Sequence, residues 1–355
     1  MRSLREAGTA IFLKKQEEVK MKLKQIIAAV LAAAMMTAMT ACSSNGGEQS
    51  QQSSEQSQSE SSGEQKFKVG VIQLIQHNAL DAATQGFVDT LTEKFGDNVE
   101  IVVQNASGDS PTCGVIANQF VSEGVDLIMA NATPALQAAA AATGTIPIVG
   151  TSVTDYATAL QISDWTGKTG TNITGTADLA PLSEQAAMIK ELFPDAKKVG
   201  ILYCSAEPNS AYQASIIKDE LSALGMESEE FTFADSNDVA AVTTSACAAS
   251  DVIYIPTDNT AASCTETINN VAQPAGVPIV AGEAGICSGC GVATLSISYY
   301  DLGKITGEMA IEILTEGKNP ADMEVRFAPD VTKMYNATIC EALGITVPED
   351  YSPLE

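Results

Sequence analysis

The chain has 355 residues, enough for two domains that each bury a core of their own. Hydrophobic residues make up 45% of it and aromatic residues only 5%, so the cores must be aliphatic, which favours buried parallel strands covered by alanine-rich helices. The formal net charge is −25, and so acidic a body would repel phosphate backbones, which excludes nucleic acid as a partner.

The first 42 residues differ from the rest in charge. Seven basic residues against three acidic ones give this segment +4 and leave −29 for the remainder. Residues 21–42 combine a short basic start, an apolar run and small residues before a cysteine. This pattern is typical of a secretory signal peptide and is too short for a comfortable membrane span.

Residues 1–20 have no place in such a signal. Glu17, Glu18 and Val19 can be encoded as a ribosome-binding sequence directly before Met21. We therefore expect Met21 to be the true start and residues 1–20 to be a misassigned upstream extension.

The end of the signal resembles the lipobox of bacterial lipoproteins, with Met39 where leucine is commoner. We expect Cys42 to become the lipidated N-terminus of the mature protein. The alternative is an ordinary cleaved signal in which Cys42 is incidental. Residues 43–65 hold only serine, glutamine, glutamate, asparagine and glycine, so we expect a flexible tether that carries a folded body outside a membrane.

The folded body repeats one pattern twice. Each half reads strand, helix, strand, helix, strand, helix, strand, with short apolar strands. The strands of the first half are FKVGVIQL, NVEIVVQN, VDLIMAN and IPIVG, and those of the second are KKVGILYC, ESEEFTF, DVIYI and VPIVAG. Predicted helices cover about 79–95 and end near 123 in the first half; in the second they cover about 209–224 and end near 249 and 271.

Such alternation predicts parallel, doubly wound sheets, because right-handed crossovers place helices on both faces. We expect an α/β fold of two lobes with a ligand cleft between them. The first lobe should cover 66–178 with a return segment near 299–317, and the second 179–298 with the C-terminal segment 318–355. Ligands of open α/β sheets lie beyond the carboxyl ends of the strands, where loops lead into helix N-termini.

The loops at these strand ends are rich in hydroxyls, amides and carboxylates, which suit a small polar ligand. For any single loop helix capping is an equal explanation, because the same residues favour N-caps. Six such loops at one face of a two-lobe repeat favour binding. The candidate ligand-binding residues are Gln76, His77, Leu80, Thr133, Pro134, Thr151, Ser152, Asn209, Ser210, Asp258, Asn259 and Glu283.

Signatures of catalysis and of metal binding are missing from the sequence. There is no GxGxxG after the first strand, no complete phosphate loop around Thr166 and no GxSxG, so we expect no enzyme. Only Cys287 and Cys290 have metal or redox spacing, and no second pair completes a zinc set, which favours a disulfide or two plain thiols over a metal. His77 is the one histidine of the chain; we expect a contact at the rim of the ligand site, with a structural histidine as the alternative.

Several segments taken together carry a family resemblance. The order LIQHNALDAATQGF, ANATPALQAAA, VTDYATA, NITGTADL, LYCSAEPNS, YIPTDNTAAS, VPIVAGEAG and ISYYDLGKITGEMA resembles the ABC-transporter substrate-binding lipoproteins of the tryptophan and tyrosine type. The resemblance covers about Phe67 to Leu314 and implies the type I periplasmic-binding fold. This chain has Gln76-His77-Asn78 where the family has Glu-His-Pro, and Tyr156 where the family has proline after VTD.

The resemblance implies a solute receptor of an ABC importer, lipid-anchored through Cys42 on the outer face of a bacterial membrane. The ligand would be an amino acid, with an aromatic one expected, and the partners an importer permease and the membrane; we expect a monomer without a cofactor. A zwitterion needs donors for its carboxylate, for which Thr133 and Ser152 are candidates, and acceptors for its ammonium, for which Asp258 and Glu283 are candidates. Leu80, Pro134 and Tyr156 are candidates for the walls around the ligand side chain.

Two alternatives keep the fold and change the function. In one, the ligand is a sugar, a nucleoside or another small polar solute. In the other, the protein is a lipid-anchored sensor that presents its closed form to a membrane receptor.

Overall fold

The computed structural model describes residues 66–328 and 330–354. The predictions for the signal peptide, for Cys42 and for the tether concern residues outside these ranges. Within them, no helix has the length and apolar character that a membrane crossing requires.

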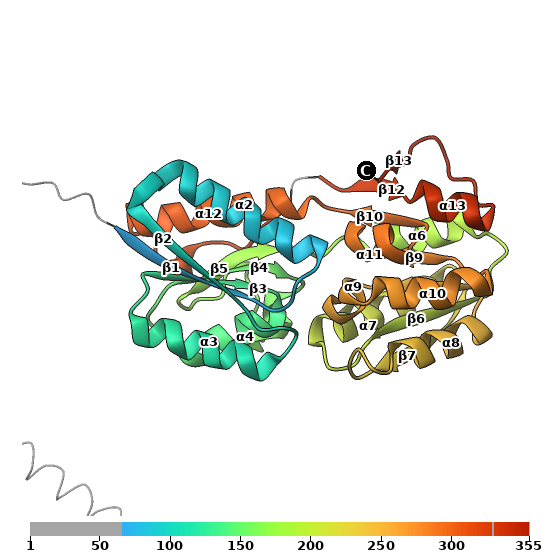
Figure 1. Ribbon diagram of the computed structural model, residues 1–355, viewed down its shortest axis with the longest axis horizontal. Coiled ribbons are helices and arrows are strands. Elements are labelled where there is room, and N and C mark those ends of the chain that lie inside the picture. The colour runs from blue at the N-terminus through green and yellow to red at the C-terminus, as the bar shows by residue number, and fades with distance from the viewer. Residues whose placement is uncertain (1–65, 329, 355) are drawn as a thin grey trace, which may run out of the picture. The chain divides into compact units, whose positions relative to one another are not determined.

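The first lobe contains a parallel sheet of six strands in the order β11-β5-β4-β3-β1-β2. Its strands are β1 (Phe67–Gln73), β2 (Val99–Asn105), β3 (Leu127–Asn131), β4 (Ile148–Val153), β5 (Ile173–Ala177) and β11 (Arg326–Phe327). Helices α2 (Asn78–Phe95) and α12 (Tyr299–Glu316) cover one face, and α3 (Ser110–Glu123) and α4 (Thr133–Ala142) cover the other (Figure 1). Val69 and Val71 of β1 pack toward α2 and α12, while Ile72 packs toward α3 and α4, as the period of two along a strand requires.

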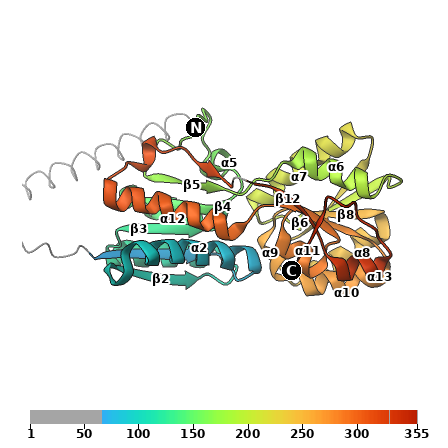
Figure 2. The ribbon, with the colours of Figure 1, turned by 90° about the horizontal axis from the view of Figure 1, so that it is seen from above.

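The second lobe contains a sheet of seven strands in the order β13-β12-β10-β9-β8-β6-β7. Its strands are β6 (Lys198–Cys204), β7 (Glu227–Phe233), β8 (Val252–Ile255), β9 (Ile279–Ala281), β10 (Ala293–Ser296), β12 (Thr332–Tyr335) and β13 (Ser352–Pro353). Helices α6 (Leu182–Leu192) and α7 (Pro208–Ala223) cover one face, and α8 (Val239–Ala249), α10 (Thr265–Ala275) and α11 (Ala284–Cys290) the other (Figure 2). The remaining short elements are η1 (Gly96–Asn98), α5 (Tyr156–Leu160), α9 (Asn259–Ser263), η2 (Pro320–Asp322) and α13 (Ala337–Leu343).

The predicted repeat is confirmed in the order of the strands. The order β5-β4-β3-β1-β2 in the first sheet corresponds to β10-β9-β8-β6-β7 in the second. In each sheet the first strand of the repeat lies between the second and the third, so the loops after the first and third strands diverge there. This divergence is the topological switch point at which open α/β sheets bind ligands. The predicted fold class, two doubly wound lobes, is therefore confirmed.

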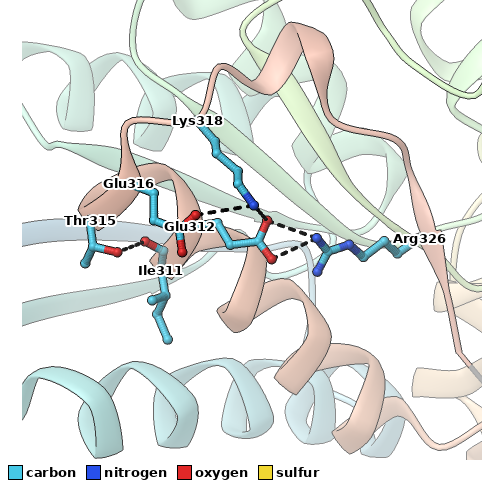
Figure 3. Close-up of polar contacts among 6 residues, drawn as sticks. All are labelled: Ile311, Glu312, Thr315, Glu316, Lys318 and Arg326. Carbon is cyan, nitrogen blue, oxygen red and sulfur yellow. Dashed lines mark hydrogen bonds and ion pairs between the residues drawn. The ribbon is translucent and has the colours of Figure 1, made fainter.

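The chain passes between the two sheets three times, and the last passage differs from our prediction. We placed 318–355 with the second lobe, but Arg326–Phe327 pairs with β5 of the first sheet, and the second sheet resumes only at β12. The Arg326 guanidinium donates to both carboxylate oxygens of Glu312 in α12, at 2.8 and 2.9 Å, and Lys318 donates to the same carboxylate at 3.1 Å (Figure 3). The return to the first lobe is longer because β11 pairs with β5 and covers its otherwise open edge, beside this ion pair.

A second difference concerns the helix that we expected to end near Val271. It continues through Pro274 to Ala275, and Gly276 then provides the C-cap with a φ of 70°. A proline in the last turn removes only one hydrogen bond, and Gly276 in the left-handed conformation caps the helix, so the helix ends four residues later than we expected.

Candidate functional site

Two hydroxyl side chains of the first lobe lie buried at strand ends. Thr133 begins α4 shortly after β3, and Ser152 is the second-last residue of strand β4. The two residues are 3% and 6% exposed. Neither hydroxyl oxygen has a hydrogen-bond partner among the described residues. Ala132 and Ser152 have φ angles of 92° and 54°, a conformation that costs energy in residues other than glycine and concentrates at functional sites.

One buried amide side chain of the second lobe has an acceptor oxygen without a hydrogen-bond partner in the described chain. Asn209, in the first turn of α7, donates from Nδ2 to Glu207 Oε2 at 3.3 Å and to the carbonyl of Thr257 at 3.2 Å. Its Oδ1, an acceptor, is buried and has no partner within 66–328 and 330–354. Sequence analysis identified Asn209 but not Glu207, whose side chain is 5% exposed.

A buried carboxylate that sequence analysis missed lies at the first passage between the lobes. Asp178 directly follows β5 and is 3% exposed. Its Oδ2 accepts a hydrogen bond from the Tyr299 hydroxyl at 2.9 Å, while Oδ1 is buried and has no partner in the described part of the chain. Burial raises the pKa of Asp178 to about 6, although the hydrogen bond from Tyr299 favours the ionised form. A signal was available, because Asp178 is an aspartate directly after a strand of the parallel sheet.

Further polar side chains connect the two lobes around Asp178. Gln213 of α7 donates to the hydroxyl of Thr154 in the first lobe at 3.4 Å and to the carbonyl of Thr257 in the second at 3.1 Å. Thr154 in turn favours the ionised form of Asp178. Sequence analysis did not select Gln213, Thr154, Thr257 or Tyr299, because none of them stands out by residue type.

Asp258 and Glu283, our candidates for the ammonium partner, both cap helices. Asp258 Oδ1 accepts from Ala261 N at 2.7 Å and Oδ2 from Cys204 N, also at 2.7 Å. Glu283 Oε2 accepts from Gly285 N at 2.6 Å, and its other oxygen accepts from the next backbone N–H. Burial raises the pKa of each to about 7, and for Asp258 the negative charge of Glu207 adds to the effect. This geometry is the capping role that we weighed as the alternative.

Other predicted residues divide between the lobe junction and the core. Ser210 favours the ionised form of Asp258, and Thr151 accepts from Thr176 Oγ1 at 3.2 Å. Leu80 and Tyr156, predicted as walls, are each 1% exposed and pack in the first-lobe core. The Tyr156 hydroxyl donates to the carbonyl of Thr176 at 3.2 Å, and the ring fills the space left by the absent side chain of Gly150.

Two hollows are lined by residues of both lobes. One, of about 280 Å³, has Leu74, Ile75 and Pro134 from the first lobe and Glu207 and Asn259 from the second in its wall. The other, of about 180 Å³, is lined by Gln76 and His77 from the first lobe and by Ser263 and Gly285, among others, from the second. Gln76 is exposed, and His77 Nε2 lies 3.2 Å from Asn259 Oδ1.

The residues that could hold a metal do not form a cluster. No group of three or more histidine, cysteine, aspartate or glutamate side chains is placed to bind a metal ion within 66–328 and 330–354. Cys287 and Cys290 are buried thiols one turn apart in α11, and Cys290 Sγ donates to the carbonyl of Ile286 at 3.4 Å.

Comparison with known proteins assigns the family. The model of the ABC transporter substrate binding protein family matches residues 68–353. The chain belongs to this family. A tyrosine-binding protein of Clostridioides difficile (strain R20291) is 36% identical to it over 289 residues, which are 81% of this chain and 83% of that protein. The predicted resemblance is thereby confirmed.

Two solved structures of substrate-binding relatives are similar to this chain to different degrees. An ABC domain in complex with L-Trp from Streptococcus pneumonia has a TM-score of 0.77 at 34% identity, covering 80% of this chain and 96% of that one. A ligand-free, open substrate-binding protein with adhesive properties from Clostridium difficile has a TM-score of 0.63 at 37% identity, covering 81% and 99%. The described structure is thus more similar to the tryptophan complex than to the open form.

Proposed function

We propose that this family member is the extracytoplasmic solute receptor of an ABC importer and that it binds an aromatic amino acid between its two lobes. In this proposal Cys42 carries the lipid anchor, the importer permease is the partner and the protein acts as a monomer. The signal and lipobox support the anchor, and the relatives that bind tyrosine or hold L-Trp support the ligand class.

One observation carries the ligand assignment, namely four of the eight buried polar atoms that have no partner in the described chain. Two belong to the Thr133 and Ser152 hydroxyls, which can donate to a carboxylate. The other two, Asp178 Oδ1 and Asn209 Oδ1, can accept from an ammonium group. An α-amino acid supplies these two groups on one carbon, and binding it would satisfy atoms whose burial otherwise costs free energy.

The proposal keeps Thr133 and Ser152 as carboxylate donors and replaces the acceptor of the ammonium. Both oxygens of Asp258 already accept backbone N–H groups, whereas one oxygen of Asp178 has no such partner. For the ligand side chain, the 280 Å³ hollow offers the apolar surfaces of Leu74, Ile75 and Pro134. Apolar side chains in the wall of a hollow suit an apolar ligand side chain.

Calorimetry on refolded protein, freed of any ligand carried over from the cell, tests the proposal. Tyrosine or tryptophan should bind, and Asp178→Asn should weaken binding more than tenfold, because truncating one partner of a buried charge pair commonly costs about 2–5 kcal/mol. Asp195→Asn, which alters an exposed aspartate in the loop before β6, is the matched control and should bind like the wild type. A sugar or nucleoside that raises the melting temperature while none of the twenty amino acids does would overturn the assignment.

A further inference from the structure

A single hydrogen bond connects the lobes beside the hollows. His77 lies in the loop between β1 and α2 of the first lobe, and Asn259 is the first residue of α9 in the second. The distance from His77 Nε2 to Asn259 Oδ1 is 3.2 Å. His77 lines the 180 Å³ hollow and Asn259 lines the 280 Å³ one, so their contact lies where the two hollows adjoin.

Glu207 fixes the orientation of the Asn259 amide. Its Oε2 accepts from the backbone N–H of Asn259 at 3.0 Å and from Asn259 Nδ2 at 2.6 Å. Its Oε1 accepts from Thr260 N at 2.8 Å and from the Thr260 hydroxyl at 2.7 Å. A carboxylate only accepts hydrogen bonds, so the amide nitrogen must face Glu207 and the amide oxygen must face His77.

This orientation determines the tautomer of His77. Because Asn259 Oδ1 only accepts, Nε2 of His77 must carry the hydrogen. Nδ1 is then an unprotonated acceptor; it is buried and has no partner among the described residues. Burial lowers the pKa of His77, while the hydrogen bond to Asn259 and the carboxylates of Glu207 and Asp81 oppose this shift without cancelling it.

The backbones of the two lobes also approach each other closely near this contact. A Cβ on Gly285 of α11 would lie 3.3 Å from Cβ of Asn78, the first residue of α2. The start of α2 thus lies close to α11, while His77 contacts Asn259 at the start of α9.

We propose that His77, Asn259 and Glu207 form a latch between the lobes, and that His77 acts on ligand affinity through this latch and not by touching the ligand. The inference rests on the proposed function, in which a ligand stabilises the closed arrangement. A contact made only between closed lobes adds to the closed state alone, so it slows release of the ligand and leaves its capture nearly unchanged. Glu207 is a positioning residue in this latch, because it acts through the Asn259 amide.

Because the chain has one histidine, nuclear magnetic resonance of its imidazole nitrogens gives a single set of signals. The full chain, labelled with ¹⁵N-histidine and purified without a histidine tag, is measured alone and with saturating tyrosine or tryptophan. With the amino acid, the signals should show the Nε2–H tautomer and a pKa below that of a free histidine. An Nδ1–H tautomer, or an ordinary pKa in both samples, would overturn the latch.

Dissociation rates measured by stopped flow provide the second readout. His77→Ala and Asn259→Ala should each release the amino acid about threefold to tenfold faster, the range expected of one partly buried hydrogen bond, with little change in association rate. His77→Gln should regain most of the loss, because its amide can donate to Asn259 Oδ1. The double variant should be no worse than either single one, whereas additive losses would contradict the pairing.

The outcome for the latch is separable from that for the proposed function. If calorimetry shows that no amino acid binds, the proposed function fails. If an amino acid binds but the imidazole signals of that sample lack the Nε2–H tautomer, the proposed function stands and the latch fails.

Discussion

Asp178 and Asp258 each lie after a strand of a parallel sheet but have different contacts. Asp258 caps α9 and also accepts from Cys204 N of β6, while Asp178 keeps one oxygen without a partner among the described residues. The difference depends on a backbone N–H that lies 54 residues away in the sequence. No local pattern around Asp258 could have distinguished a cap from a ligand acceptor.

Asp258→Asn should destabilise the ligand-free protein by about 1–3 kcal/mol, as measured by denaturant unfolding at pH 8, where the carboxyl is ionised. Asparagine caps about as well as aspartate, so capping alone predicts no loss. In the variant, however, the asparagine amide nitrogen would face the N–H of Cys204, so two hydrogen-bond donors would point at each other. Unchanged stability together with a tenfold loss of amino-acid affinity would instead return the ammonium to Asp258, as the sequence predicted.

The buried carboxyls also predict how stability depends on pH. Asp178 has a pKa of about 6, and Asp258 and Glu283 have pKa values of about 7, all raised by burial above their unfolded values near 4. The folded state therefore binds more protons between pH 5 and 7, and the contribution of these groups to stability is lost as the pH rises through 7. His77 has a lowered pKa, so its contribution to stability increases with pH. It is one group against the three carboxyls.

The free energy of unfolding of the ligand-free protein, from urea titrations, should thus fall from pH 5 to pH 7.5. Glu283→Gln should flatten this slope, whereas Asp195→Asn should not. A free energy that rises over this range would show that the three carboxyls are ionised throughout.

Among the predicted site residues, the hydroxyls and the amide at strand ends were easier to choose than the walls. Thr133, Ser152 and Asn209 were selected because polar residues after parallel strands gather at one edge, and all three are buried with an unpartnered atom. Leu80 and Tyr156 were selected for size, but an apolar side chain near a cleft can equally turn into the core, and its direction depends on long-range packing. Tyr156 turns inward because Gly150 leaves room for its ring.

At the scale of elements, the contact between α2 and α12 depends on glycine. A Cβ on Gly303 of α12 would overlap the carbonyl oxygen of Ala83, and one on Gly86 of α2 would overlap that of Tyr300. The two helices can therefore approach until backbone meets backbone. The sequence indicated that the segment near 299–317 returns to the first lobe, but not that it packs on α2.

Gly303→Ala should destabilise the protein by about 1–3 kcal/mol, because the added methyl group forces the two helices apart. Gly114→Ala is the matched control, since Gly114 is also within a helix, α3, and a Cβ there would meet nothing within 4 Å. That control should stabilise the protein by about 0.5–1 kcal/mol, because alanine favours a helix more than glycine does. Equal effects of the two substitutions on the melting temperature would contradict the packing argument.

The long elements were predictable, and the short ones were not. The repeated order of strands and helices located β1–β4, β6–β9 and their helices, because most of these strands are apolar and turn residues separate them from the helices. The two-residue strand β11 has no such pattern, and it pairs with β5, which lies far away in the sequence. Pairing of so short a segment with a distant strand cannot be derived from local periodicity.

For the whole molecule, the repeat was the strongest signal, because two copies of one strand order require two sheets and two sets of ligand loops. Sequence could not show which polar groups of the two sets meet. Gln213 reaches Thr154, and His77 reaches Asn259, across separations of 59 and 182 residues. Such contacts depend on how the three connecting segments place one lobe against the other.

The last prediction concerns the anchoring of the whole molecule. In our proposal Cys42 carries the lipid anchor, so Cys42→Ser should release the protein from cell membranes into the medium. The ligand groups of the proposal lie between Thr133 and Asn209, far from Cys42 in the sequence, so amino-acid affinity in calorimetry should stay unchanged. Cys247→Ser, which alters a half-exposed cysteine of α8, is the matched control and should stay with the membrane fraction. Labelled fatty acid should be incorporated into the wild type and this control, but not into Cys42→Ser. A wild type that is already released, or a Cys42→Ser variant that remains with the membrane, would contradict the lipoprotein assignment and leave the ligand proposal intact.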